Sequence, residues 1–485
     1  MDEFNLLFVA RKSVRGAFAL ISRTFFLQIL SIATFLIISA KLNPEIFGIF
    51  VIAQSIIVFF NYFQDIGLAA SLIQKKEEPS LSEYRSVFTT QQIIVLALVI
   101  PSIIFSGPIA SFYNLDGQGQ LLFIALVFSF FLTSLRTIPS VMLERKLDYG
   151  KLVIPQIGEN VVYNVALIVL VLMNFEITSF TIAVLLRSIV GLVLTYIVMP
   201  WKIGISFHLV HMKKLFSFGI PFQANSVLAL VKDDLLIVYI GKILSFTQVG
   251  YVGFAQKVAF YPLRLVMDNV IRITFPSYSR LQHDPAAMKI AIEKSLFLIS
   301  FFVFPAAFAI MFLSESFLSV LPRYEQYLPA VLSIMFFAAN TIFSSISTPL
   351  TNFLNAIGKV RITLYFMAFW TAATWGLTFV FIEWFGYNGV AMASFAVSLT
   401  SIGVLVVARR YVRFSVLRPV LRQLLACVFM VIFILLTRGF VSSLPTFILE
   451  VLAAGAVYSV VIFMLAKTEL LKTGKFVYHS VRHTS

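Results

Sequence analysis

Long apolar segments dominate this chain and restrict its fold more than any other feature. A segment of roughly 20 apolar residues crosses a bilayer as a helix, and fourteen segments reach about that length. They lie at about residues 14–40, 46–73, 86–110, 119–143, 152–173, 178–200, 214–241, 248–275, 290–313, 328–354, 361–382, 388–411, 417–438 and 444–466. Transmembrane strands would be shorter and would alternate apolar with polar residues. The sequence therefore predicts an all-α polytopic membrane protein with about 14 transmembrane helices.

The composition supports this prediction and excludes several kinds of chemistry. Only 12% of the 485 residues are charged, whereas about a quarter are charged in soluble proteins. The first apolar run is too long for a cleavable signal peptide, so we expect it to be a retained span. The single cysteine, Cys427, excludes an intrachain disulfide and a thiolate metal cluster. The five histidines lie in connections or in the tail, so we expect no metal and no other cofactor.

The distribution of basic residues predicts how the chain crosses the membrane. If both termini lie inside, only four of the 37 lysines and arginines fall in outer connections, as the positive-inside rule requires. The net charge of +15 then reflects topology and does not indicate nucleic-acid binding. We expect two basic clusters to contact anionic membrane lipids on the inner side: Arg409, Arg410, Arg413, Arg418 and Arg422, and Lys467, Lys472 and Lys475.

An internal echo predicts two similar lobes. The stretch FGIFVIAQ at residues 47–54 and the stretch VGYVGFAQ at residues 249–256 match in Gly, Ala and Gln at an offset of 202 residues. They open the second and eighth predicted helices, so the lobes would be parallel repeats of six helices. We predict an N-lobe, a cytoplasmic linker, a C-lobe, two additional helices and a basic cytoplasmic tail, at residues 1–200, 201–213, 214–411, 412–466 and 467–485.

Charged residues inside the predicted spans indicate where the function lies. A charge inside a bilayer is costly, faces the bundle interior or water, and marks a functional site. The bases in spans are Arg23, Arg136, Arg187, Lys232, Lys257, Arg264 and Arg272, and the acids counted with them are Asp65, Glu159, Asp233, Asp234 and Asp268. On the eighth predicted helix, four of these residues form one stripe: Lys257, Arg264, Asp268 and Arg272. The excess of two positive charges predicts a cleft that binds an anionic substrate, because guanidinium groups suit phosphate.

Two other interpretations of these charges remain open. The basic side chains could form internal ion pairs or extend to the interface. The five acids are candidates for coupling transport to an ion gradient, because a desolvated carboxylate can exchange a proton. Asp268 could equally be a permanent partner of Arg264 or Arg272, each four residues away. In the run of Lys232, Asp233 and Asp234, we expect the lysine to face the cleft and one aspartate to pair with it or with the eighth helix.

Several sequence blocks resemble the Wzx-type polysaccharide flippases of the polysaccharide transport family, within the multidrug/oligosaccharidyl-lipid/polysaccharide exporter superfamily, and are most similar to colanic-acid-exporter-like members. The resemblance covers residues 10–470. The blocks that carry it are LNPEIFGIFVIAQ, DIGLAASLIQKKE, LERKLDY, FSFGIPF, VGYVGFAQKVAFYPLRL and FPSYSRLQHD, beginning at residues 42, 65, 143, 216, 249 and 275.

The resemblance implies a specific function. It implies a two-lobed, alternating-access bundle in the bacterial inner membrane that moves undecaprenyl-diphosphate-linked oligosaccharide repeat units from the inner to the outer leaflet. It also implies basic cleft residues that hold the diphosphate, coupling to an ion gradient, and a polysaccharide polymerase and chain-length regulator as partners. No motif assigns the coupling role to one aspartate.

Two other functions are weighed against it. A multidrug antiporter of the same fold would bind organic cations and would need an acidic or apolar cavity. A polyisoprenoid-dependent glycosyltransferase or polymerase would need a long outer loop with catalytic residues, and every connection here is short. The basic excess favours a transporter that is not an enzyme.

Overall fold

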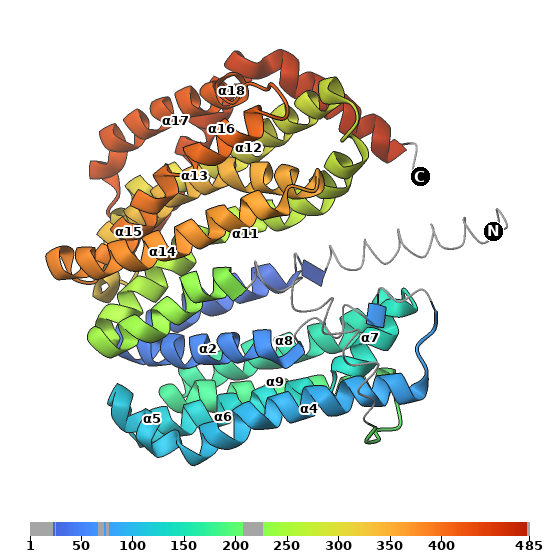
Figure 1. Ribbon diagram of the computed structural model, residues 1–485. Coiled ribbons are helices and arrows are strands. Elements are labelled where there is room, and N and C mark those ends of the chain that lie inside the picture. Colours follow the sequence, from blue (N-terminus) through green and yellow to red (C-terminus); the bar gives the residue numbers. More distant parts are fainter. Residues whose placement is uncertain (1–22, 25, 66–71, 74–76, 207–226, 483–485) are drawn as a thin grey trace. The chain divides into compact units, whose positions relative to one another are not determined.

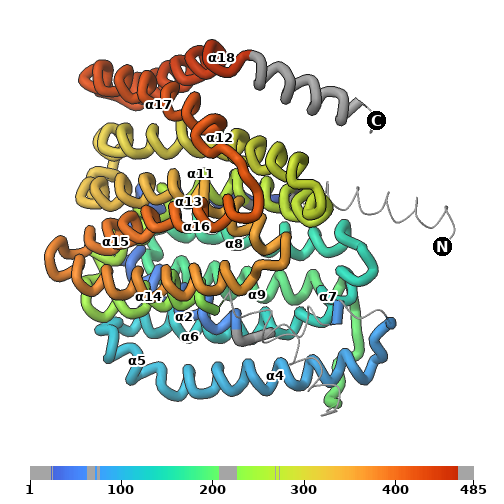
Figure 2. Tube along the Cα trace, turned by 45° about the horizontal axis from the view of Figure 1, so that its top comes forward, coloured from blue at the N-terminus to red at the C-terminus, as the bar shows by residue number. Residues whose placement is uncertain are grey.

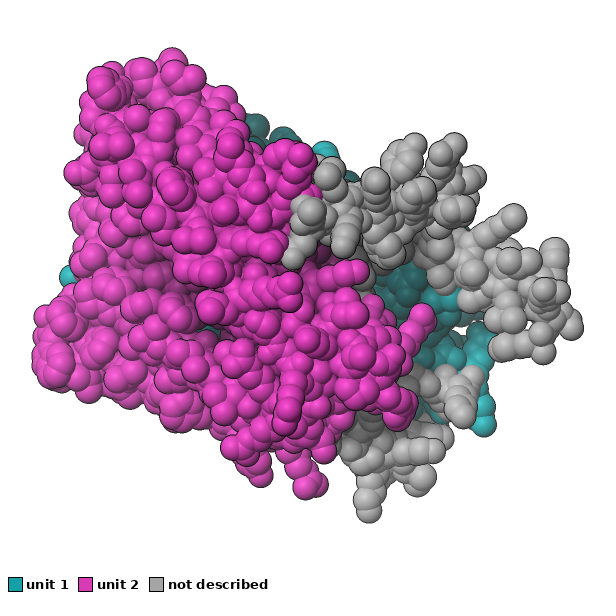
Figure 3. Space-filling view, turned by 90° about the horizontal axis from the view of Figure 1, so that it is seen from above, with its two compact units in different colours: residues 1–250 teal, residues 251–485 magenta. Residues whose placement is uncertain are grey.

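The computed structural model describes residues 23–24, 26–65, 72–73, 77–206 and 227–482; within these ranges the side chains of residues 63–65, 268, 272–273 and 468–482 are also left undescribed. Every regular element in the described ranges is a helix. They divide into two compact units, residues 1–250 and 251–485, which Figure 3 shows in separate colours.

Unit 1 is a bundle of apolar helices (Figure 1). An apolar helix over Phe26–Lys41 precedes α2 (Pro44–Asp65), α4 (Leu81–Ile104), α5 (Ser106–Tyr113), α6 (Gly117–Ser134), α7 (Thr137–Arg145), α8 (Tyr149–Leu172) and α9 (Ile177–Val198). A further helix covers residues 227–243. The core of unit 1 is rich in aromatic rings: Phe50 of α2 stacks on Phe180 of α9 with ring centroids 4.1 Å apart. Helix α9 packs against both α6 and α8.

Unit 2 contains the rest of the chain (Figure 2). Its elements are α11 (Phe246–Arg280), which begins in unit 1, α12 (Pro285–Val320), η1 (Glu325–Ala330), α13 (Val331–Ala356), α14 (Val360–Phe385), α15 (Asn388–Leu399), α16 (Ile402–Arg409), α17 (Leu417–Thr437), η2 (Arg438–Phe440) and α18 (Leu444–Arg482). Helix α12 packs against both α13 and α17. The two additional helices predicted at residues 412–466 therefore share the apolar core of unit 2, in which Cys427 is fully buried.

The all-α membrane fold is confirmed, because the described residues contain eleven helices long and apolar enough to cross a membrane. These correspond to eleven of the fourteen predicted segments. Of the other three segments, the first and the seventh are only partly described. The eighth is helical throughout as part of α11. The count of fourteen and the lobe boundaries remain predictions.

The internal echo corresponds to a close helix crossing within residues 1–250. Gly48 and Gly250, which are 202 residues apart, lie where α2 and α11 meet. A Cβ atom on Gly48 would lie 1.9 Å from the carbonyl oxygen of Phe246, and one on Gly250 would lie 1.9 Å from that of Pro44. Pro44 and Phe246 are also 202 residues apart, so the contact is reciprocal.

Candidate functional site

One face of α8 carries the polar residues around which the candidate site is built. Gln156, Glu159 and Tyr163 are spaced at i, i+3 and i+7, which places them on one side of a helix. Each contacts an arginine from a different part of unit 1. We call these arginines the arginine ladder: Arg23, Arg136 and Arg187.

A break in the fourth predicted span positions Arg136. Helix α6 ends at Ser134 and α7 begins at Thr137, so Arg136 lies between them as the N-cap of α7. Pro139 has no N–H to offer the carbonyl of Leu135 four residues earlier. The hydroxyl of Tyr196 on α9 donates to that carbonyl instead, at 3.0 Å. The carbonyl that the proline leaves without a backbone donor is therefore hydrogen-bonded by Tyr196, and Arg136 lies at the break itself.

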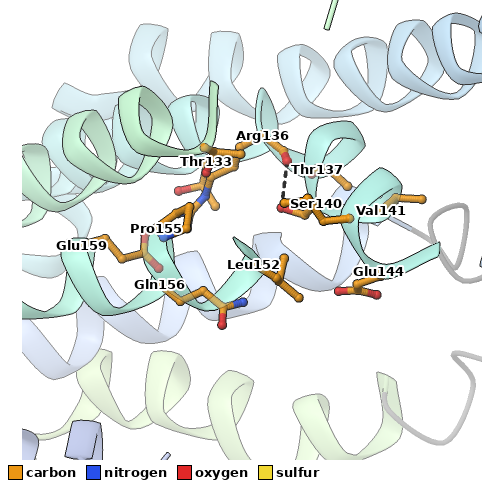
Figure 4. A pocket seen from close by; sticks show the side chains of 12 residues that line it. Thr133, Arg136, Thr137, Ser140, Val141, Glu144, Leu152, Pro155, Gln156 and Glu159 are labelled. Atoms are coloured by element: carbon orange, nitrogen blue, oxygen red, sulfur yellow. Dashed lines mark hydrogen bonds and ion pairs between the residues drawn. The ribbon is translucent and has the colours of Figure 1, made fainter. Parts of the chain in front are cut away.

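The central step of the ladder is a buried ion pair between Arg136 and Glu159 (Figure 4). The Arg136 guanidinium donates to the Glu159 carboxylate, and their side chains are only 17% and 6% exposed. Gly191 on α9 makes room for the pair, because a Cβ atom there would lie 2.5 Å from both Nη1 of Arg136 and Oε2 of Glu159. A buried carboxylate needs such a partner, since an isolated charge in a low dielectric is strongly disfavoured.

A cavity of about 250 Å³ adjoins this ion pair. Figure 4 shows Arg136, Glu159 and Gln156 among its lining residues. Four hydroxyl groups also line it, from Thr133, Thr137, Ser140 and Thr195, as does the carboxylate of Glu144. One water occupies about 30 Å³ of liquid, so the cavity has room for several waters or for a phosphate-sized group, and its lining can donate and accept hydrogen bonds.

The outer two steps of the ladder are a hydrogen bond and a cation–π contact. The Arg23 guanidinium donates to Oε1 of Gln156 and, at 3.3 Å, to the hydroxyl of Thr24. The Arg187 guanidinium lies 5.5 Å from the ring centroid of Tyr163, a cation–π arrangement. The structure thus brings together four predicted site residues of unit 1, the three arginines of the ladder and Glu159.

The charged run on the helix over residues 227–243 forms a local pair. Nζ of Lys232 lies 2.6 Å from Oδ1 of its neighbour Asp233, whose side chain is 63% exposed. The pairing of this lysine with an adjacent aspartate is confirmed. Asp233 and Asp234 are also within electrostatic reach of Tyr62 on α2.

The remaining predicted residues are described only in part. Lys257 and Arg264 on α11, two helical turns apart, both have exposed side chains. The side chains of Asp65, Asp268 and Arg272 lie outside the described set. The stripe on α11 and the coupling role of these acids therefore stay predictions.

Sequence reasoning missed three residues that matter here. Gly191 and Gln156 gave no signal in the sequence, because a glycine and a glutamine are common in membrane helices. Glu450 gave a clear signal, because it is an acid inside the fourteenth predicted span. The count of five acids in the sequence analysis omitted it. It is 6% exposed, and its Oε1 accepts a hydrogen bond from Thr437 at 2.7 Å. Adding Glu450 to the residues counted above leaves seven bases against six acids, an excess of one.

Comparison with known proteins places the chain in a family of polysaccharide biosynthesis proteins. Residues 37–332 match the family described as "Polysaccharide biosynthesis protein". The chain is 22% identical over 348 residues to an "Uncharacterized membrane protein in cps region" of Klebsiella pneumoniae, covering 70% of each chain. It is 23% identical over 223 residues to the "Lipopolysaccharide biosynthesis protein WzxC" of Escherichia coli K12, covering 46% of this chain and 43% of WzxC.

A solved structure shares the fold. The lipid II flippase MurJ in an inward closed conformation superposes with a TM-score of 0.75, over 94% of this chain and 100% of MurJ, at 16% sequence identity. At this identity the likeness concerns the fold alone.

Proposed function

Because the chain belongs to the polysaccharide biosynthesis protein family, we propose that it is a flippase for undecaprenyl-diphosphate-linked oligosaccharide repeat units. It moves them from the inner to the outer leaflet of the bacterial inner membrane by alternating access, for surface or exopolysaccharide synthesis. Both termini lie in the cytoplasm. The basic clusters contact anionic lipids of the inner leaflet, and a polysaccharide polymerase and a chain-length regulator act on the exported units.

The observation that carries this proposal is the arginine ladder beside the cavity in unit 1. Three guanidinium groups contact the polar face of α8, and Arg136 lines the cavity together with the carboxylates of Glu144 and Glu159. A lipid diphosphate brings about two negative charges, and arginine binds phosphate oxygens through paired donors. The guanidinium groups of the ladder are therefore the groups that bind the diphosphate of the cargo.

The ion pair suggests how binding could be coupled to a gradient. A phosphate that binds Arg136 competes with Glu159 for the guanidinium. A phosphate bound to Arg136 would separate the buried ion pair, and separating such a pair is costly. Glu159 is thus our first candidate for proton coupling, ahead of Asp65, Asp233, Asp234 and Asp268, because it alone is described in contact with the ladder.

The basic surplus argues against the two other functions. An antiporter of organic cations would repel its substrate at this site. A glycosyltransferase would need catalytic carboxylates on an outer loop. In the described ranges the outer connections between spans are short, such as Asn174–Glu176 between α8 and α9.

Binding by the purified protein tests the proposal. We expect undecaprenyl diphosphate to bind tightly, and ethidium, an organic cation, to bind weakly. Replacing Arg136 by Gln should weaken diphosphate binding by about 10- to 100-fold, the effect expected for losing one charge-assisted hydrogen bond. Tight binding of ethidium with no binding of the diphosphate would favour the antiporter instead.

A further inference from the structure

A second polar face lies on α13 in unit 2, and it carries no charge. Asn340, Ser344, Thr348, Thr351 and Asn355 follow one another along the helix. At 100° per residue they fall within an arc of about 80°. We call this set the α13 polar stripe. In the predicted topology it occupies the cytoplasmic half of the helix.

The stripe is partly accessible, which separates it from the lipid-facing surfaces of the same unit. All five of its residues have intermediate exposure. In α13, which is described throughout, the only large hydrophobic residue that is exposed is Leu332 in the first turn. By contrast, α14 exposes Tyr365 and Trp384 at 71% and 70%. A row of amides and hydroxyls facing lipid would lose its hydration, so we infer that the stripe does not face lipid.

The hydrogen bonds of the central residues leave capacity for a ligand. Ser344 donates to Oδ1 of Asn340 at 2.8 Å, and Thr348 and Thr351 donate to carbonyls of α13 itself at 2.7 and 2.8 Å. Their protons are used, but a hydroxyl oxygen has two lone pairs. The adjacent Asn352 has a buried Nδ2 with no hydrogen-bond partner. The face therefore offers several acceptors, and a rotation of the Asn352 side chain would add one unused donor.

Helix packing explains only the two ends of the stripe. Nδ2 of Asn340 donates to the carbonyl of Ser394 on α15 at 2.8 Å, and Asn355 accepts from Thr363 on α14 at 2.6 Å. Such bonds commonly join membrane helices. The bonds of Ser344, Thr348 and Thr351 quoted above stay within α13, so they do not hold a neighbouring helix.

We propose that the α13 polar stripe, with Asn352, binds the neutral sugar portion of the lipid-linked cargo, an inference that rests on the proposed function. Sugar hydroxyls both donate and accept. They donate to the oxygens of Ser344, Thr348 and Thr351 and accept from Nδ2 of Asn352 once that side chain has rotated out of its buried position. The stripe has no charge to balance an ionic ligand, and a neutral polyol needs none.

The test compares two lipids that differ only in the sugar. Binding of undecaprenyl diphosphate, and of the same lipid carrying a neutral glucose–galactose disaccharide, is measured by thermophoresis on the full-length protein in detergent. Ser344→Ala/Thr348→Val and Asn352→Leu are the variants, and Ser347→Ala is the matched control. Ser347 is buried on the same helix.

We expect the wild type to bind the glycosylated lipid more tightly than the bare lipid. Each variant should lose about 5- to 10-fold in affinity for the glycosylated lipid, the effect of one or two neutral hydrogen bonds. Each should keep its affinity for the bare lipid, which also shows that it is folded. The control should bind both lipids as the wild type does.

The other outcomes separate this inference from the proposed function. If the wild type binds both lipids equally, or if the variants bind the glycosylated lipid normally, the stripe does not bind the sugar. A diphosphate affinity that depends on Arg136 would still support the flippase. If the wild type binds neither lipid, both proposals are wrong.

Discussion

The polar faces of α8 and α13 differ in whether they carry charge. Both place polar groups inside a helix that is otherwise apolar. The α8 face gathers three arginines around Gln156, Glu159 and Tyr163, whereas the α13 polar stripe contains only amides and hydroxyls. A charged face can select a charged group with few contacts, while an uncharged face needs many weak ones. Under the two proposals made above, the face in unit 1 would recognise the common lipid diphosphate and the face in unit 2 would recognise the sugar that distinguishes one cargo from another.

The largest effect is expected from separating the buried ion pair on α8. Arg136→Gln leaves the Glu159 carboxylate without its partner and should lower the free energy of unfolding by about 3–5 kcal/mol. The double variant Arg136→Gln/Glu159→Gln removes both charges and should regain most of that stability. Thermal unfolding in detergent measures both.

Diphosphate binding by the same variants distinguishes a structural role from a binding role. If Arg136 holds the diphosphate, the stable double variant still binds it poorly. Normal binding by the double variant would mean that the pair only stabilises the bundle, and the contrast between the two faces would disappear.

The sequence predicted the charged residues of this site but not the contacts between them. Arg23, Arg136, Glu159 and Arg187 were identified because a charge in an apolar span is conspicuous in one dimension. The sequence did not predict that the arginines contact one face of α8. Those contacts depend on Gln156, on Tyr163 and on the break between Ser134 and Thr137. These residues are ordinary in isolation, and only the packing of α7, α8 and α9 gives them their roles.

The same limit applies to the fold. Hydrophobic length was sufficient to locate eleven spans, because a membrane helix forms all of its backbone hydrogen bonds within its own segment. The Gly48 and Gly250 crossing was visible as a repeat, but its reciprocal backbone contact depends on tertiary structure. The α13 polar stripe went unnoticed, because the search followed charge and the stripe has none.

A smaller effect is expected from filling the space beside the ion pair. Gly191→Ala places a methyl group 2.5 Å from atoms of both Arg136 and Glu159, and such overpacking costs about 1–3 kcal/mol. Diphosphate affinity should fall with it, because the guanidinium is displaced. Gly455→Ala on α18 is the matched control, since a Cβ atom there meets nothing within 4 Å. Equal behaviour of the two variants would contradict the tight packing around the pair.

The cation–π step of the ladder should contribute less than the ion pair. Tyr163→Leu removes the ring beneath Arg187 and should weaken diphosphate binding by about 3- to 10-fold, as loss of about 1 kcal/mol of positioning would. Tyr163→Phe keeps the ring and should bind normally. A loss in both variants would instead assign the effect to the Tyr163 hydroxyl, which thermophoresis with the bare lipid would reveal.

Salt should produce the smallest change, and it compares the two faces without any substitution. Raising ionic strength from about 0.05 to 0.5 M shortens the Debye length from roughly 14 to 4 Å and weakens attraction between partly exposed charges. Affinity for bare undecaprenyl diphosphate should therefore fall. The ratio of affinities for the glycosylated and bare lipids should change by less than about twofold, because neutral hydrogen bonds are not screened. A ratio that fell in step with the diphosphate affinity would show that the sugar is also held by charge. Lys257 and Arg264, exposed on α11, would then be the residues to test in place of the α13 polar stripe.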